Sequence, residues 1–267
     1  MYKKVFHIVV YIFAAVGFFL TAGFFAVKYG FTNTKGVIDE QREGFLAPKS
    51  DAEIEWNKGE EWDTLRAALK KDEVVINRVS KETGVPSRKI VSVVVVEQLR
   101  LFYSERETFK QVFAPLKILG TQSQFSWGVA GIKPDTAKAV EENLKNPNSS
   151  YYLGKNYENM LDFKTENPDE ERYARLTDYK NRYYSYLYTA LYLKQIDTSW
   201  KKAGFPIDEK VGVLATLYNI GFARSIPKEN PSIGGAEIKI GASSYSFGGL
   251  AEEFYKSGEL LDTFPRF

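Results

Sequence analysis

Ile90-Val91-Ser92-Val93-Val94-Val95-Val96 is an almost uninterrupted apolar run, and the carboxylate of Glu97 closes it. Four consecutive valines favour a strand by intrinsic propensity. A helix over 86–103 is favoured by Pro86, which suits a first helical turn, by the length of the segment, and by the helical spacing of later segments. In either geometry Glu97 lies among apolar side chains, where a carboxylate is costly unless it is paired or protonated.

Helical spacing recurs on both sides of this run. Residues 60–71 and 73–82 predict two short helices, the second ended by Gly84. Further helices are predicted over 135–144, 173–196, 208–220 and 249–261. Residues 237–247 alternate weakly, which is compatible with a small β-hairpin. We therefore predict a mainly α domain.

The N-terminal segment predicts a membrane anchor. Residues 5–27 carry no charge, and these 23 residues can span a bilayer with some tilt. The alternative, a signal peptide, usually has an apolar core of about 7–15 residues. Lys3 and Lys4 favour a cytoplasmic N-terminus, although Lys28 weakens the asymmetry. We expect a single-pass transmembrane anchor over 1–28, a stalk over 29–58, and an extracytoplasmic domain over 59–267 on the periplasmic or cell-wall side.

The amino-acid composition limits which side chains can carry out catalysis. The chain has no cysteine, and its one histidine, His7, lies in the apolar N-terminal segment. Acid–base chemistry in the remainder must therefore use Asp, Glu, Lys or Tyr, and we expect no metal site and no cofactor. Residues 29–267 contain 33 basic and 34 acidic residues, a formal charge of −1. This balance gives no electrostatic reason to expect a nucleic-acid partner.

Two later segments join Glu97 as candidates for the site. The first is Ser126-Trp127-Gly128-Val129-Ala130-Gly131-Ile132-Lys133-Pro134-Asp135-Thr136-Ala137, and the second is Ala215-Thr216-Leu217-Tyr218-Asn219-Ile220-Gly221. With Glu97 ending an apolar helix, this ordered set resembles the lysozyme-like lytic transglycosylases, the superfamily of soluble lytic transglycosylases and goose-type lysozymes. The resemblance covers roughly residues 75–225. The positions that match its motifs are Gly128, Ile132, Pro134, Thr136, Ala137, Tyr218, Asn219 and Gly221.

The sequence departs from the resembled pattern at three positions. Gln98 follows the glutamate where the family usually has Ser, and Ala130 and Gly131 stand where it has Met and Gln. These changes affect the expected sugar contacts but leave the acid in place.

The resemblance implies a lysozyme-like α-helical fold and cleavage of peptidoglycan. Glu97 would be the general acid and then the base, giving 1,6-anhydro ends through a route that needs one carboxylate. Burial raises the pKa of a carboxyl group, as this role requires. The expected substrate-binding residues are Ser126, Trp127, Gly128, Val129, Ala130, Gly131, Ile132, Tyr183, Tyr188, Tyr218 and Asn219.

Other interpretations stay open. Glu97 and Arg100 have the spacing of a simple ion pair on a helix surface, and tyrosines at helical spacing are more often core residues than ligand contacts. Glu105 and Glu107 are candidates for a second carboxylate, which a hydrolytic lysozyme or chitosanase-like enzyme would need. A third interpretation is an inactive wall-binding scaffold. The expected partners are peptidoglycan strands, the membrane through residues 5–27, and a cell-envelope protein complex.

Overall fold

The computed structural model describes residues 55–103, 128–240 and 243–266, together with Tyr11 and residues 17–18. The chain divides into two compact units, Met1–Glu43 and Gly44–Phe267. Most of the predicted anchor over 1–28 and of the stalk over 29–58 lies outside the described residues, so these two assignments stay predictions. In the described part, no helix is long and apolar enough to cross a membrane.

The described part of Gly44–Phe267 is mainly α, as predicted, and it includes a small antiparallel hairpin at the expected place. Its elements, in chain order, are η1 (Glu55–Asn57), α2 (Glu60–Lys71), α3 (Glu73–Thr83), α4 (Ser87–Tyr103), α6 (Pro134–Lys145), η4 (Lys155–Tyr157), α7 (Pro168–Thr177), α8 (Tyr183–Lys202), α9 (Val211–Ile220), η5 (Phe222–Arg224), β1 (Glu237–Ile240), β2 (Ser243–Ser246) and α10 (Phe247–Lys256).

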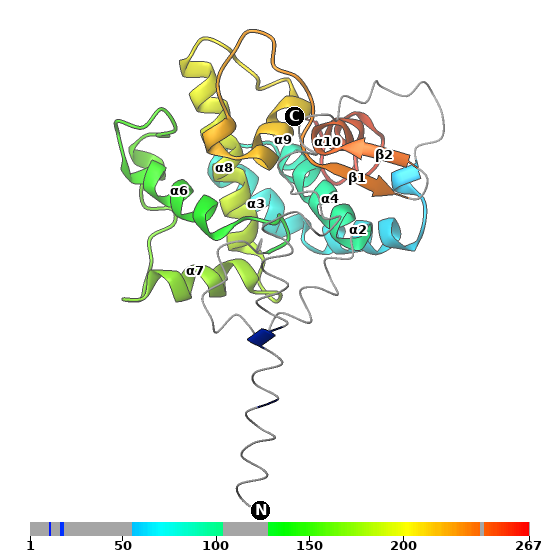
Figure 1. Cartoon of the computed structure of the whole chain (residues 1–267), viewed down its shortest axis with the longest axis horizontal. Helices are drawn as coiled ribbons and strands as arrows, with labels where there is room; N and C mark the ends of the chain where they lie inside the picture. The colour runs from blue at the N-terminus through cyan, green and yellow to red at the C-terminus, as the bar shows by residue number, and fades with distance from the viewer. Residues whose placement is uncertain (1–10, 12–16, 19–54, 104–127, 241–242, 267) are drawn as a thin grey trace, which may run out of the picture. The chain divides into compact units, whose positions relative to one another are not determined.

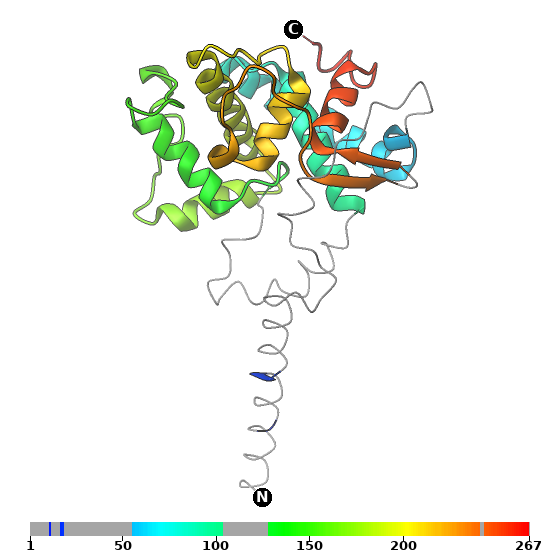
Figure 2. The ribbon, with the colours of Figure 1, turned by 45° about the horizontal axis from the view of Figure 1, so that its top comes forward.

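Helix α4 is the central element of this unit. It contacts α2, α3, α8, α9, α10 and strand β1. Figures 1 and 2 show α6 and α7 on one side of it, and the hairpin with α10 on the other. A helix that is apolar around its whole circumference is stable only inside a core, and nearly every α4 residue from Ser87 to Leu99 is buried. The valine run therefore forms a fully enclosed helix rather than a helix with one apolar face.

A buried arginine attaches the C-terminal segment to the start of α4. The Arg88 side chain is fully buried and donates hydrogen bonds to backbone carbonyls of the C-terminal segment. The five acceptors are Phe254, Tyr255, Ser257, Glu259 and Phe264, at 2.8–3.1 Å. Burial lowers the pKa of this guanidinium, and the charge of Arg266 lowers it further. The segment that follows α10 is thus an integral part of the core.

Two sequence predictions need correction. The helix predicted over 173–196 is two helices, α7 and α8, because Asp178 and Asn181 accept hydrogen bonds from nearby backbone N–H groups and form a turn between them. The predicted stalk over 29–58 extends too far, since Trp56 is fully buried. Its ring packs against Trp62 at 5.0 Å and Phe254 at 5.9 Å between ring centroids.

Candidate functional site

Three segments that are distant in sequence meet at the Glu97 carboxylate. Glu97 lies near the end of α4, Gly131 in the loop before α6, and Tyr218 in α9. Gly131 lies so close that a Cβ atom built on it would be 2.7 Å from Oε2 of Glu97. The Tyr218 hydroxyl donates a 2.8 Å hydrogen bond to the carbonyl of Ala130. The fold therefore brings together the acid, the glycine-containing loop and the tyrosine that the sequence singled out.

The Glu97 side chain is 4% exposed and forms an ion pair with Arg100. Nε and Nη2 of Arg100 donate to the same oxygen, Oε2, at 3.0 and 2.5 Å. The predicted alternative of an ion pair is thus present, but inside the protein and not on a helix surface. Burial disfavours the ionised carboxylate, whereas the guanidinium favours it.

The loop beside Glu97 is held on both sides by side chains. Gln98 of α4 donates to the Val129 carbonyl at 2.6 Å, and the Val129 N–H donates to Ser185 of α8 at 3.1 Å. Gly128 has φ +70°, and a Cβ atom there would lie 2.4 Å from the Ser185 hydroxyl oxygen. A side chain at Gly128 would therefore push the loop off α8.

Tyr218 is a buried neutral donor next to the acid. Its ring centroid lies 4.8 Å from that of Tyr192 and 6.5 Å from that of Phe247. Burial raises the pKa of Tyr218 well above its ordinary value, and the nearby charge of Glu97 raises it further. Its hydroxyl consequently stays protonated across the pH range in which a protein works, and it holds the loop through Ala130.

The remaining predicted site residues lie outside the described part of the chain, are buried, or bond to another segment. Ser126 and Trp127 lie outside the described residues. The Ala130 and Ile132 side chains are buried, so from these residues only the backbone could reach a ligand. The Asn219 side-chain oxygen accepts a 2.9 Å hydrogen bond from the Ala236 N–H, which ties α9 to the segment before β1.

The two tyrosines chosen on α8 make contacts with other helices. The Tyr183 hydroxyl donates to Glu82 of α3 at 2.6 Å, and burial followed by the Glu82 hydrogen bond raises its pKa to about 12. Tyr188 is completely buried and donates to Glu141 of α6 at 2.5 Å. Tyr188 therefore has no surface to offer a sugar, and it is a core residue as the alternative interpretation had it.

Sequence reasoning missed two groups at this site. Ser185 and Thr189 lie one turn apart on α8, where the Ser185 hydroxyl fixes the loop. The Thr189 hydroxyl donates to the Ser185 carbonyl at 2.8 Å and lies close to Tyr218. A serine or threonine inside a tyrosine-rich helix has no sequence signal of its own. The i, i+4 spacing of two hydroxyls on a buried helix face was the available clue.

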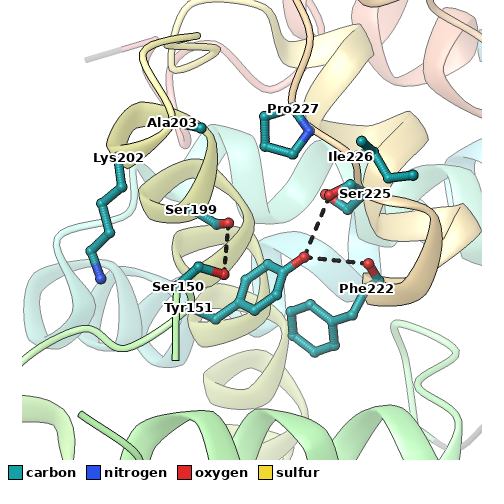
Figure 3. A pocket seen from close by; sticks show the side chains of 9 residues that line it. All are labelled: Ser150, Tyr151, Ser199, Lys202, Ala203, Phe222, Ser225, Ile226 and Pro227. Atoms are coloured by element: carbon teal, nitrogen blue, oxygen red, sulfur yellow. Dashed lines mark hydrogen bonds between the residues drawn. The ribbon is translucent and has the colours of Figure 1, made fainter. Parts of the chain in front are cut away.

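A separate pocket of about 480 Å³ lies between the end of α8 and the segment after α9 (Figure 3). Tyr151 is one of its lining residues, and the Tyr151 hydroxyl donates to the carbonyls of Phe222 and Ser225. No predicted site residue lines it. Its lining residues are Ser150, Tyr151, Ser199, Lys202, Ala203, Phe222, Ser225, Ile226 and Pro227.

Comparisons with protein-family models, with curated proteins and with solved structures found no match for this chain. The part of the chain that the structure describes contains no group of three or more His, Asp or Glu side chains able to hold a metal ion. The functional argument therefore rests on the geometry around Glu97.

Proposed function

We propose that this chain is a lytic transglycosylase with a lysozyme-like fold, which cleaves the β-1,4 bond between N-acetylmuramic acid and N-acetylglucosamine in peptidoglycan. The observation that carries the proposal is the buried Glu97 carboxylate, which lies close to Tyr218 and so close to Gly131 that a Cβ atom there would clash with it. Glu97 is the general acid and then the general base. The proposal includes anchoring by residues 5–27, with the domain on the periplasmic or cell-wall side, where the cell-envelope complex would be found.

The reaction needs one carboxyl group that changes role. Protonated Glu97 gives its proton to the glycosidic oxygen as the bond from that oxygen to C1 of muramic acid breaks. The carboxylate then removes the proton from the C6 hydroxyl of the same sugar, and the C6 oxygen bonds to C1. The acid regains its proton, no water is consumed, and the new end is a 1,6-anhydro ring. The N-acetyl group of the sugar stabilises the cationic intermediate.

The environment of Glu97 supports this role. The Glu97 carboxyl group is only 4% exposed, and removal from water disfavours the ionised form of a carboxyl group. Tyr218 fixes the adjacent backbone through the Ala130 carbonyl, so the loop keeps its position while the carboxyl changes charge. Because Tyr218 holds this backbone in place, the loop itself needs no rearrangement during the reaction, and such preorganisation lowers the barrier.

Gly131 explains one departure from the resembled family. Its φ is +61°, and any side chain there would meet the Glu97 carboxylate. The chain consequently presents backbone at a position where that family presents a glutamine amide. In the proposed enzyme, the sugar contacts at this point come from backbone groups of Gly128 to Ile132, since glycine allows a ligand to approach the chain closely.

A second function is favoured by one specific observation. The Arg100 ion pair is what a purely structural Glu97 would also form. A non-catalytic peptidoglycan-binding module therefore competes with the enzyme, and so does a hydrolase on the same fold that uses a second carboxylate.

One experiment separates these functions. Purified full-length chain is incubated with peptidoglycan strands, and new glycan ends are analysed for wild type and Glu97→Gln. Glu171→Gln is the matched control, because Glu171 also pairs with an arginine at 2.5 Å and is 13% exposed. We expect anhydro ends from wild type and the control, and none from Glu97→Gln. Free reducing ends would favour the hydrolase, and binding without cleavage by wild type would favour the module.

A further inference from the structure

The pocket between α8 and the segment after α9 has mostly apolar walls (Figure 3). Phe222, Pro227 and Ile226 contribute to these walls, and Ile226 is 70% exposed although its side chain is large and apolar. The volume of about 480 Å³ lies within the range of about 300–1,000 Å³ that small-ligand sites occupy. Such sites add a few polar groups to an apolar lining, and these groups fix the orientation of the ligand. The polar groups of this pocket therefore indicate what it can bind.

Two serine hydroxyls of the pocket have a proton to donate. Ser225 is 3% exposed, and its hydroxyl oxygen accepts a 2.9 Å hydrogen bond from Nε1 of Trp200. The Ser150 hydroxyl oxygen accepts a 3.2 Å hydrogen bond from Ser199. Within the part of the chain that the structure describes, neither Ser150 nor Ser225 donates through its hydroxyl. Both hydroxyls can thus donate to acceptor oxygens of a ligand.

The charge at the pocket is positive. Lys202 is the one charged side chain among the described residues that line it. Its Nζ donates to the carbonyl of Tyr152 at 2.9 Å, and it forms no ion pair with any acidic side chain of the described residues. A carboxylate accepts strong hydrogen bonds from an ammonium group and from hydroxyls. The pocket therefore suits a ligand with a small apolar body and one carboxylate.

Aromatic contacts link the pocket to the Glu97 site. The ring centroid of Phe222 lies 4.5 Å from that of Tyr192, which in turn lies 4.8 Å from that of Tyr218 beside Glu97. Two ring contacts thus separate the wall of the pocket from the residue next to the candidate acid. An extended peptide covers about 3.3–3.6 Å per residue, so a chain of about three to five residues is long enough to connect the two places over the surface.

We propose that this pocket binds the peptide that muramic acid carries on its lactyl group. The small apolar side chains at the end of the peptide pack against Phe222 and Ile226, and its free terminal carboxylate binds Lys202. Binding energy gained here, away from the cleaved bond, positions the glycan at Glu97. This inference rests on the proposed function and adds to it a second point of recognition on the same substrate.

The direct test is a binding titration that needs no cleavage. One ligand is an acetylated trialanine peptide whose last two residues have the D configuration, and the other is the same peptide with its terminal carboxylate converted to an amide. Isothermal titration calorimetry measures Kd for the full-length chain and for three variants. Lys202→Gln removes the charge, and Ala203→Trp fills the pocket from an exposed lining position. Lys201→Gln is the matched control, because Lys201 precedes Lys202 on α8 but is not among the described lining residues.

We expect wild type and Lys201→Gln to bind the free peptide about threefold to fivefold more tightly than the amide, as an exposed ion pair predicts. Lys202→Gln should bind both peptides equally. Ala203→Trp should weaken the binding of both by about tenfold or more, because the indole takes the apolar space of the ligand. Wild type that binds neither peptide, wild type that binds both equally, or unchanged binding by Ala203→Trp would overturn the inference.

Cleavage separates a failure of this inference from a failure of the proposed function. The measured quantity is kcat/KM for glycan strands with and without their peptides. Wild type should prefer the strands that carry peptides, and Ala203→Trp should cleave bare strands at the wild-type rate but lack this preference. Wild type that cleaves both kinds of strand equally would overturn the inference alone. If wild type cleaves neither kind, the proposed function itself fails, even where the titration shows that the pocket binds the peptide.

Discussion

Gly131→Ala is the substitution that tests the Glu97 site most sharply within the fold. The new Cβ would lie 2.7 Å from Oε2 and 2.8 Å from Cδ of Glu97, whereas ordinary contact begins at 3.4 Å. The carboxylate must therefore retreat by about 0.7 Å, into a region where it is nearly enclosed. Since a 1 Å misplacement of a reacting group costs about a hundredfold in rate, we expect a fall of roughly tenfold to a hundredfold.

Gly204→Ala separates this effect from backbone strain. Gly204 also has a positive φ, +86°, and a Cβ atom there would have no neighbour within 4 Å. Both variants carry the cost of a left-handed alanine, about 1–2 kcal/mol in the free energy of unfolding, and Gly131→Ala carries the displacement of Glu97 in addition.

The assay is urea denaturation together with initial rates of glycan cleavage. Gly204→Ala should be less stable than wild type but fully active, whereas Gly131→Ala should be the less stable of the two and roughly tenfold to a hundredfold slower. Wild-type rates in Gly131→Ala would refute the placement of the reacting carboxylate against this loop.

Three further predictions concern the surroundings of the site and the core. Tyr218→Phe removes the donor to the buried Ala130 carbonyl, so the free energy of unfolding should fall by about 1–3 kcal/mol and the cleavage rate with it; unchanged values in both assays would exclude the hydroxyl from the site. Arg88→Met leaves buried carbonyls of the C-terminal segment without their donor, so we expect a loss of about 3 kcal/mol or more in urea denaturation, and a loss no larger than that of the exposed Arg66→Met would contradict the account. Burial raises the pKa of Glu171, but hydrogen bonds from Thr165 and Lys164 outweigh this and lower it from 4.5 to about 2. The stability that Glu171 contributes is thus fully present above pH 4.5 and is lost as the pH falls toward 2. Glu171→Gln should therefore flatten the dependence of the free energy of unfolding on pH in that window.

The helices were predictable where local signals agree. Pro86 before α4, Pro134 at the start of α6 and Gly84 after α3 are all at helix ends in the structure. These residues act through their own backbone preferences, so no tertiary information is needed. The turn between α7 and α8 was missed because Asp178 and Asn181 interrupt the helix through side-chain hydrogen bonds that periodicity does not reveal.

The sequence identified residues of the candidate site better than it identified the contacts between them. The sequence singled out Glu97, Gly131 and Tyr218, but the approach of Gly131 to the carboxylate depends on the fold of three separate segments. The buried Arg88 and its five carbonyl partners depend on residues more than 160 positions away. Spacing along a chain cannot specify such long-range contacts, and for the same reason Tyr188 was chosen as a sugar contact although it is in the core.

The central claim is that Glu97 alone carries out both proton transfers in the cleavage of peptidoglycan. Mass spectrometry of glycan fragments produced in ¹⁸O-labelled water tests it most directly, with wild type and Glu97→Gln treated in parallel. The account predicts fragments from wild type whose new ends are lighter by one water than a hydrolysis product and contain no ¹⁸O, and no fragments from Glu97→Gln. New ends that contain ¹⁸O, or the same fragments from both proteins, would contradict it.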